Sequence, residues 1–212
     1  MRLFNNCIKV IVVKKNAEKQ CGIVIKSYLP GKQKLIVLDQ YHGKVEMVPN
    51  VATVYAGMHV IYTRMPAAGS HYFMNDVEII DVPCELVQHD LLFLHHIFEL
   101  CLYGIPFGNC AQDVYELLVR LYNMQAHFKN SYNKKIFLFK LLQVIGMHPD
   151  SGQDQALSLN RLTFEPLDIL LHETIDLEVE SALDIWLTEC IIAHPYNRNF
   201  KTVHFLAKNR VV

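Results

Sequence analysis

The clearest candidates for chemistry are lysines near the start of the chain, where positive charge is concentrated. Residues 1–44 hold nine Lys or Arg against two Asp or Glu. Clustered ammonium groups attract phosphates through counterion release, which gives an affinity that depends steeply on salt and little on base sequence. The predicted contacts to such a polyanion are Lys9, Lys14, Lys15, Lys19, Lys26, Lys32, Lys34 and Lys44.

Tyrosines lie on or beside the same part of the chain and offer flat aromatic faces. Proteins that hold single strands of nucleic acid stack unpaired bases on such rings. The alternative is that most of these tyrosines pack in the core or at its rim. The tyrosines in question are Tyr28, Tyr41, Tyr55, Tyr62 and Tyr72, of which Tyr41 is taken as a predicted DNA contact.

Motifs for catalysis are missing from the sequence. The nine glycines form no phosphate-binding loop, and no nucleophile elbow or zinc-binding HExxH helix occurs. The six cysteines form no CxxC pair, and His95 and His96 are adjacent, so they point about 100° apart on a helix. We therefore expect no catalytic residue, no metal, no cofactor and no small-molecule substrate.

Composition indicates an ordinary folded protein with a generous core. The 212 residues are 51% hydrophobic and 19% charged, with a net charge of −1. No run approaches the ~20 apolar residues of a membrane span, and the N-terminus lacks the features of a signal peptide, so we expect a cytoplasmic protein. Charge is banded, because residues 165–189 hold eight acidic groups and no basic one. Such banding suggests one basic surface for a polyanion and an acidic face elsewhere.

The first 83 residues read as β structure. β-Branched and aromatic residues dominate several short runs, and turn pairs such as Pro30-Gly31 and His42-Gly43 separate them. Five or six short strands in about 80 residues suit an OB-fold-like barrel, and an SH3-like barrel is the structural alternative. The predicted strands are 7–13, 22–28, 34–38, 44–48, 53–65 and 72–80.

Pro83 ends the β region, and helical periodicity follows. Helices are predicted over 87–103, after a cap at Asn109, around 165–174, over 179–193 and near 202–207, while 148–160 reads as a polar loop. The fold class is therefore α+β, with an N-terminal barrel (1–83) followed by an all-helical C-terminal domain (84–212).

Residues 131–150, SYNKKIFLFKLLQVIGMHPD, predict a helix that is apolar on almost every side. Ser131 can cap its start and Gly146 its end. Such a helix belongs in the middle of a helical domain.

This helix, with its aromatic–x–aromatic–x–Leu-Leu run followed by Gly and Pro, resembles the central helix of the RecO family of bacterial recombinational-repair proteins. The strand-turn segment KLIVLDQYHGKVEMVP and the tail IIAHPYNRNFKTVHFL are similar to family segments in the same order. One departure is plain. Many relatives carry a Cys-rich zinc module after the central helix, whereas residues 149–160 here contain no cysteine.

The resemblance implies a non-enzymatic recombination mediator in DNA repair, associated with the bacterial nucleoid. Such proteins have an OB domain before a helical domain, bind single- and double-stranded DNA and anneal complementary strands. They engage the tail of the single-strand-binding protein and, with a RecR-type partner, help load the recombinase at gaps. The barrel lysines would carry the DNA.

A cationic rim beside an apolar pocket would fit the acidic, Phe-ending tail of the single-strand-binding protein. The alternative is a basic rim on a core helix. The predicted peptide contacts are Lys134, Lys135, Phe137, Lys140 and Leu141.

A second class of function also fits the sequence. An OB-like barrel can serve as a protein-interaction scaffold without direct DNA binding, with the acidic 165–189 segment recruiting a basic partner.

Overall fold

The computed structural model describes residues 18–28, 34–50, 53–66, 71–147, 153–173 and 176–202. The predicted strand at 7–13 and most of the predicted helix near 202–207 lie outside these residues.

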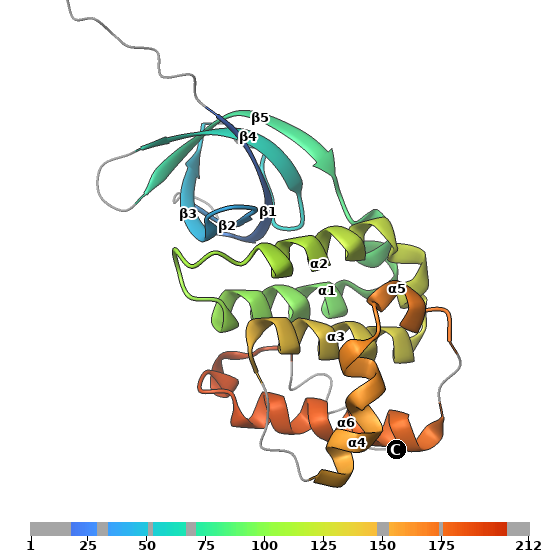
Figure 1. The fold of residues 1–212 in the computed structure, drawn as a ribbon. Helices are drawn as coiled ribbons and strands as arrows, with labels where there is room; N and C mark the ends of the chain where they lie inside the picture. The colour runs from blue at the N-terminus through green and yellow to red at the C-terminus, as the bar shows by residue number, and fades with distance from the viewer. Residues whose placement is uncertain are drawn as a thin grey trace, which may run out of the picture.

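Five strands close into an N-terminal barrel (Figure 1). They are β1 (Lys19–Ser27), β2 (Leu35–Asp39), β3 (Gly43–Pro49), β4 (His59–Pro66) and β5 (Tyr72–Asp81). Their order around the barrel is β1-β2-β3-β5-β4, and β4 pairs back with β1. All pairs are antiparallel except β3 with β5. This closed barrel followed by helices confirms the predicted mixed architecture and is consistent with an OB-like barrel.

Strands β1 and β2 have two buried faces, which explains their nearly continuous apolar sequences. Successive side chains on a strand point to opposite faces. Val24 and Val37 therefore lie inside the barrel, whereas Ile23 and Leu38 belong to the same core cluster as the helices. The helix-facing residues of β1 and β2 therefore share one core with the helices, while the barrel interior forms a separate cluster.

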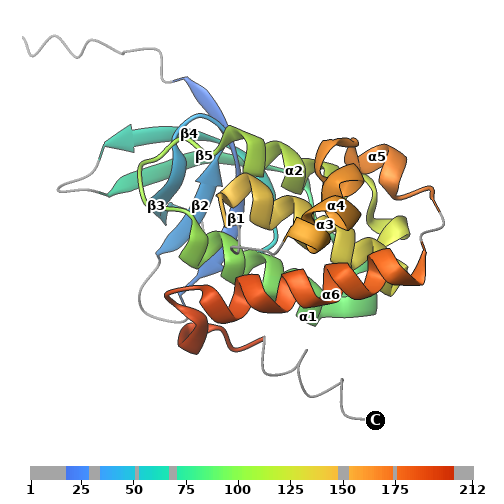
Figure 2. The same ribbon diagram turned by 60° about the horizontal axis from the view of Figure 1, so that its bottom comes forward.

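The helical part stacks beneath the barrel in layers (Figures 1 and 2). Helices α1, α2 and α3 run side by side, and α6 lies on the side of α3 away from the barrel. The elements are α1 (Cys84–Gly104), α2 (Gln112–Asn123), η1 (Gln125–Lys129), α3 (Ser131–Ile145), α4 (Gln153–Phe164), α5 (Leu167–Leu170), α6 (Leu177–Ala193) and η2 (Asn197–Asn199).

Helix α3 is the central helix of this layer, as its sequence predicts. It contacts α1, α2, α5 and α6, and eight of its fifteen residues are buried. It ends at Gly146, whose left-handed backbone (φ 84°) lets Met147 N donate to Leu142 O at 2.9 Å. Its start differs from the prediction, because the Asn130 side chain, not Ser131, accepts from Tyr132 N at 2.9 Å.

Other helix boundaries also differ from the sequence prediction. Part of the predicted polar loop is α4, which buries Leu159 and Leu162 among polar neighbours. Between residues 165 and 173 only the short α5 is α-helical. Helix α2 begins without a side-chain cap from Asn109, since that residue lies in the turn before it. These errors arise where contacts distant in sequence outweigh local propensity.

Three buried histidines predict a loss of stability in acid. Burial lowers the pKa values of His59, His96 and His194, for His96 to about 4. Each is neutral in the folded chain, whereas an unfolded histidine takes up a proton below a pH of about 6.5. Their contribution is therefore fully present above that pH and is lost as the pH falls through it, by up to about 3 kcal/mol for His96.

Urea unfolding at several pH values from about 7.5 to 4.5 measures this loss, and the range brackets the titration of histidine. We expect the free energy of unfolding to fall in acid, and equally so in a variant of the exposed His89 (His89→Gln). A free energy that stays constant over this range would contradict the neutral, buried state of these three side chains.

Candidate nucleic-acid interface

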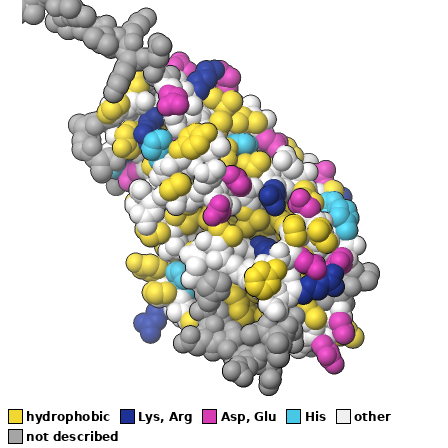
Figure 3. All heavy atoms as spheres, in the orientation of Figure 1, with side chains coloured by type: hydrophobic (Ala, Val, Ile, Leu, Met, Phe, Trp, Pro, Cys, Tyr) yellow, Lys and Arg dark blue, Asp and Glu magenta, His cyan; other side chains and the backbone are white. Residues whose placement is uncertain are grey.

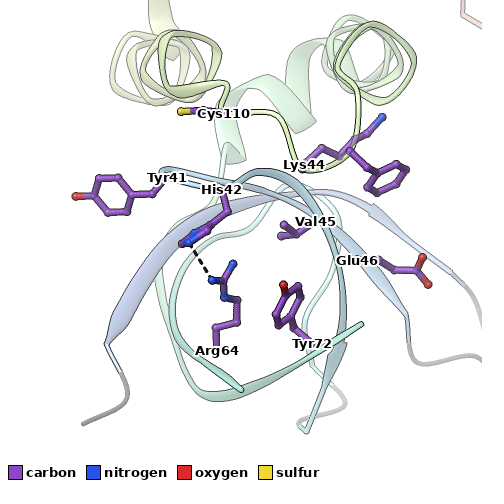
Figure 4. A pocket seen from close by; sticks show the side chains of 10 residues that line it. Tyr41, His42, Lys44, Val45, Glu46, Arg64, Tyr72 and Cys110 are labelled. Carbon is purple, nitrogen blue, oxygen red and sulfur yellow. Dashed lines mark hydrogen bonds between the residues drawn. The ribbon is translucent and has the colours of Figure 1, made fainter. Parts of the chain in front are cut away.

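A pocket of about 550 Å³ opens at one end of the barrel, against the loop that follows α1. Figure 4 looks into it: Arg64, Tyr72 and Val45 lie within the ring of strands, and Tyr41 extends outward. The mouth of a β-barrel is a common place for a ligand. The lining residues are Tyr41, His42, Lys44, Val45, Glu46, Arg64, Tyr72, Phe107, Gly108 and Cys110.

Arg64 on β4 is the cation inside this pocket. Its guanidinium carbon lies 4.5 Å from the centre of the Tyr72 ring, in a cation–π contact. Its Nη2 lies 2.9 Å from His42 Nε2. Among the described residues Arg64 has no carboxylate partner in an ion pair. The pocket therefore presents a positive charge that is held in place without being neutralised directly.

Asp39, the last residue of β2, orients His42 of the pocket lining. Its carboxylate is fully buried and accepts hydrogen bonds from Tyr41 N (2.9 Å) and His42 N (2.8 Å). It also accepts from the hydroxyl of Tyr62 and lies 2.8 Å from His42 Nδ1. Burial, together with the charge and hydrogen bond of Asp39, raises the pKa of Tyr62. The phenol is therefore a permanent donor that fixes the buried carboxylate.

Lys44 joins the pocket to the helical layer. It is 5% exposed, and its Nζ donates to Leu102 O in the last turn of α1. The same Nζ lies 4.4 Å from the centre of the Phe107 ring. Burial lowers the pKa of Lys44. This lysine was predicted to contact phosphate. The structure corrects that prediction, because the ammonium group instead donates to a carbonyl at the C-terminal end of α1.

A glycine lets the loop after α1 approach the barrel. Gly43 has φ +64°, and a Cβ atom there would lie 1.6 Å from Asn109 O. Gly108 N also donates to Lys44 O at 3.1 Å. This close backbone contact holds the loop on β3, and it leaves the Phe107 ring 55% exposed at the edge of the pocket.

The other predicted DNA contacts have different surroundings. Tyr41 is 57% exposed at the pocket, which leaves its ring available for stacking. Lys19 pairs with Glu78 at 2.8 Å, and Lys34 pairs with Glu46 at 2.5 Å, so both charges are partly balanced. Lys26 Nζ lies 4.8 Å from the centre of the Tyr28 ring. The remaining predicted contacts, Lys9, Lys14, Lys15 and Lys32, lie outside the described residues.

The predicted peptide contacts on α3 do not form an exposed surface. Phe137 and Leu141 are fully buried, because α3 is surrounded by other helices. Lys134 pairs with Asp90, Lys135 pairs with Glu180 and Asp184, and Lys140 donates to Thr163 O at 3.0 Å. Phe137 and Leu141 are therefore core residues, and the three lysines connect α3 to its neighbours.

Charges on one face of the molecule are mixed in sign. On the face drawn in Figure 3, Lys and Arg lie among Asp and Glu instead of forming one broad basic patch. Part of the predicted acidic segment is paired within the fold, since Glu165 and Glu173 bind Arg161. Within the described ranges, no group of three or more His, Cys, Asp or Glu is placed to hold a metal ion.

Several pocket residues were not identified from the sequence. His42 and Arg64 lie 22 residues apart in the sequence and come together only in the closed barrel. Phe107 had one usable signal, because an aromatic residue stands alone in the turn sequence Gly104-Ile105-Pro106-Phe107-Gly108. Such turns are normally exposed, which would place this aromatic ring at the surface.

Comparison with models of protein families finds no match to this sequence. Comparison with curated proteins finds no match either. In the part of the chain that the structure describes, no helix has both the length and the apolar character needed to cross a lipid bilayer.

Proposed function

We propose that this protein is a non-enzymatic, DNA-binding recombination mediator of the RecO type, and that the mouth of its barrel binds single-stranded DNA. The observation that carries the proposal is the pocket, where exposed Phe107 and Tyr41 flank the Arg64–Tyr72 pair. Proteins bind an unpaired strand by stacking its bases on aromatic rings and by attracting its phosphates with positive charge, and this pocket offers both.

The position of the pocket on the barrel supports the same proposal. OB folds bind oligonucleotides on the surface of their second and third strands and on adjoining loops. Here the turn between β2 and β3 contributes Tyr41 and His42, and β3 contributes Val45 and Glu46. A ligand that reaches Arg64 therefore lies against the same side of the barrel.

The RecO resemblance places this binding within a larger activity. The chain would bind single- and double-stranded DNA, anneal strands, and act in the cytoplasm at the nucleoid. A RecR-type mediator and the tail of the single-strand-binding protein would be its partners. Because Phe137 and Leu141 are buried, the tail would dock elsewhere than on the predicted face of α3.

A titration of the protein against fluorescent single-stranded DNA, repeated from ~50 to ~200 mM salt, tests the proposal. The pocket has room for few phosphates, and charges of both signs lie on the face drawn in Figure 3, so we expect about two or three phosphate contacts. Since each contributes about −0.7 for a single strand, the logarithm of affinity should fall against the logarithm of salt with a slope of roughly −1.4 to −2.1.

An Arg64→Gln variant is the matched test of the pocket, because it removes the charge while keeping a polar side chain. Its affinity should be weaker and its slope smaller by about one contact. No binding by the wild-type protein at the lowest salt would overturn the proposal. That outcome would favour the protein-interaction scaffold.

A further inference from the structure

Hydrogen-bond chemistry assigns the proton of His42. A carboxylate only accepts and a guanidinium only donates. Asp39 therefore takes the Nδ1–H of His42, and the bare Nε2 accepts from Arg64, at 2.8 and 2.9 Å. His42 is thus neutral in this arrangement, and Arg64 is held by a lone pair that protonation would remove.

Several charged or titratable groups surround His42. From β2 it faces Asp39, from β4 Arg64, and Tyr62 reaches it through Asp39. The pocket also contains Lys44 and Glu46 from β3, and Cys110 lies across it in the loop after α1.

Glu46 already forms an ion pair with Lys34, and its carboxylate lies 3.7 Å from His71 Nδ1. Arg64 contacts the His42 ring directly.

We propose that Arg64 and His42 together form a phosphate-binding subsite, in which His42 is the positioning residue that couples phosphate binding to uptake of a proton. The inference rests on the proposed function and names the group of the nucleic acid that the pocket recognises. With His42 neutral, the subsite carries one positive charge, and part of the hydrogen-bonding capacity of Arg64 is directed at the imidazole.

Protonation of His42 changes both the charge of the subsite and the hydrogen bonds that it can donate. An added proton on Nε2 turns an acceptor into a donor, so two cationic donors face each other across the former hydrogen bond. A phosphate oxygen between them accepts from both and relieves their repulsion. By linkage, a ligand that favours the protonated form must bind more tightly as the pH falls.

The test measures the affinity for a fluorescent oligo-dT at about pH 8, 7 and 6, the range in which histidine titrates. Neither thymine nor a phosphodiester changes charge there. Three proteins are compared, namely wild type, His42→Gln and His71→Gln. Gln can accept from Arg64 but does not titrate. His71 is a matched control, because the His71 and His42 side chains are 35% and 37% exposed and both lie near the pocket.

We expect the affinity of the wild type and of His71→Gln to rise at least about fivefold from pH 8 to pH 6, the low end of typical coupling. His42→Gln should lose that gain. Loss of the gain with His71→Gln instead, or its retention in His42→Gln, would overturn the inference while leaving the proposed function standing. If no oligo-dT binds at any pH, the proposed function fails as well.

The hydrogen bonds provide a second readout that does not depend on ligand. In a protein with ¹⁵N-labelled histidine, the ring nitrogens of His42 should report the Nδ1–H tautomer at pH 8 by NMR. The Nε2–H tautomer at that pH would contradict the arrangement from which the inference starts.

Discussion

Replacement of Phe137 by alanine is expected to lower the free energy of unfolding by about 3–5 kcal/mol, the usual cost of truncating a buried phenylalanine. The Phe137 ring is fully buried in α3 and packs edge-on against Phe93 and Phe128, with ring centres 6.2 and 5.4 Å away. Truncation would open a cavity between three elements that cannot easily collapse. Denaturant unfolding followed by circular dichroism measures the effect.

Phe164→Ala provides the matched control. Phe164 ends α4 and is 79% exposed, so its loss should change stability by no more than about 0.5 kcal/mol. A Phe137→Ala protein as stable as the wild type would show that the ring is not part of the core. It would also restore Phe137 as a candidate for contact with a peptide.

Loss of both exposed rings at the pocket should weaken binding of single-stranded DNA by roughly 30-fold or more. A stacked base contributes about 1–3 kcal/mol, and the Tyr41→Ala/Phe107→Ala double variant removes two stacking faces. One side of Phe107 is covered by Lys44, which leaves the other side for a base. Fluorescence anisotropy with a short oligo-dT at low salt gives the affinities.

The control for this change is another exposed ring of the barrel. Phe73 on β5 is 41% exposed and does not line the pocket. Phe73→Ala should therefore bind as the wild type does. An equal loss of affinity in the Phe73 variant and the double variant would mean that DNA does not bind specifically at the barrel mouth.

The sequence was sufficient to predict the helix at the centre of the fold. In α3 almost every position is apolar, so burial on all sides was the natural expectation, and Gly146 marked its end correctly. The same argument could not show that Phe137 and Leu141 are core residues and not contacts for a bound peptide. That distinction depends on which helices surround α3, and the local pattern does not specify them.

For the barrel lysines, composition predicted their number but not their partners in the fold. Their number was evident, but their partners are distant in the chain: Glu78 for Lys19 and Leu102 O for Lys44. An ion pair or a buried hydrogen bond changes what a lysine offers to a ligand. The pocket was hidden for the same reason, since β2–β3, β4, β5 and the loop after α1 meet only when the barrel closes.

Thiol reactivity measures most directly whether a single strand occupies the pocket. Cys110 is an exposed, free cysteine in the pocket lining, and Cys84 is an exposed, free cysteine at the start of α1. Mass spectrometry can follow the modification of each by a thiol reagent, with and without saturating oligo-dT. We expect oligo-dT to slow the modification of Cys110 and to leave that of Cys84 unchanged. An unchanged rate for Cys110 in a protein that has bound the oligonucleotide would contradict binding at the pocket.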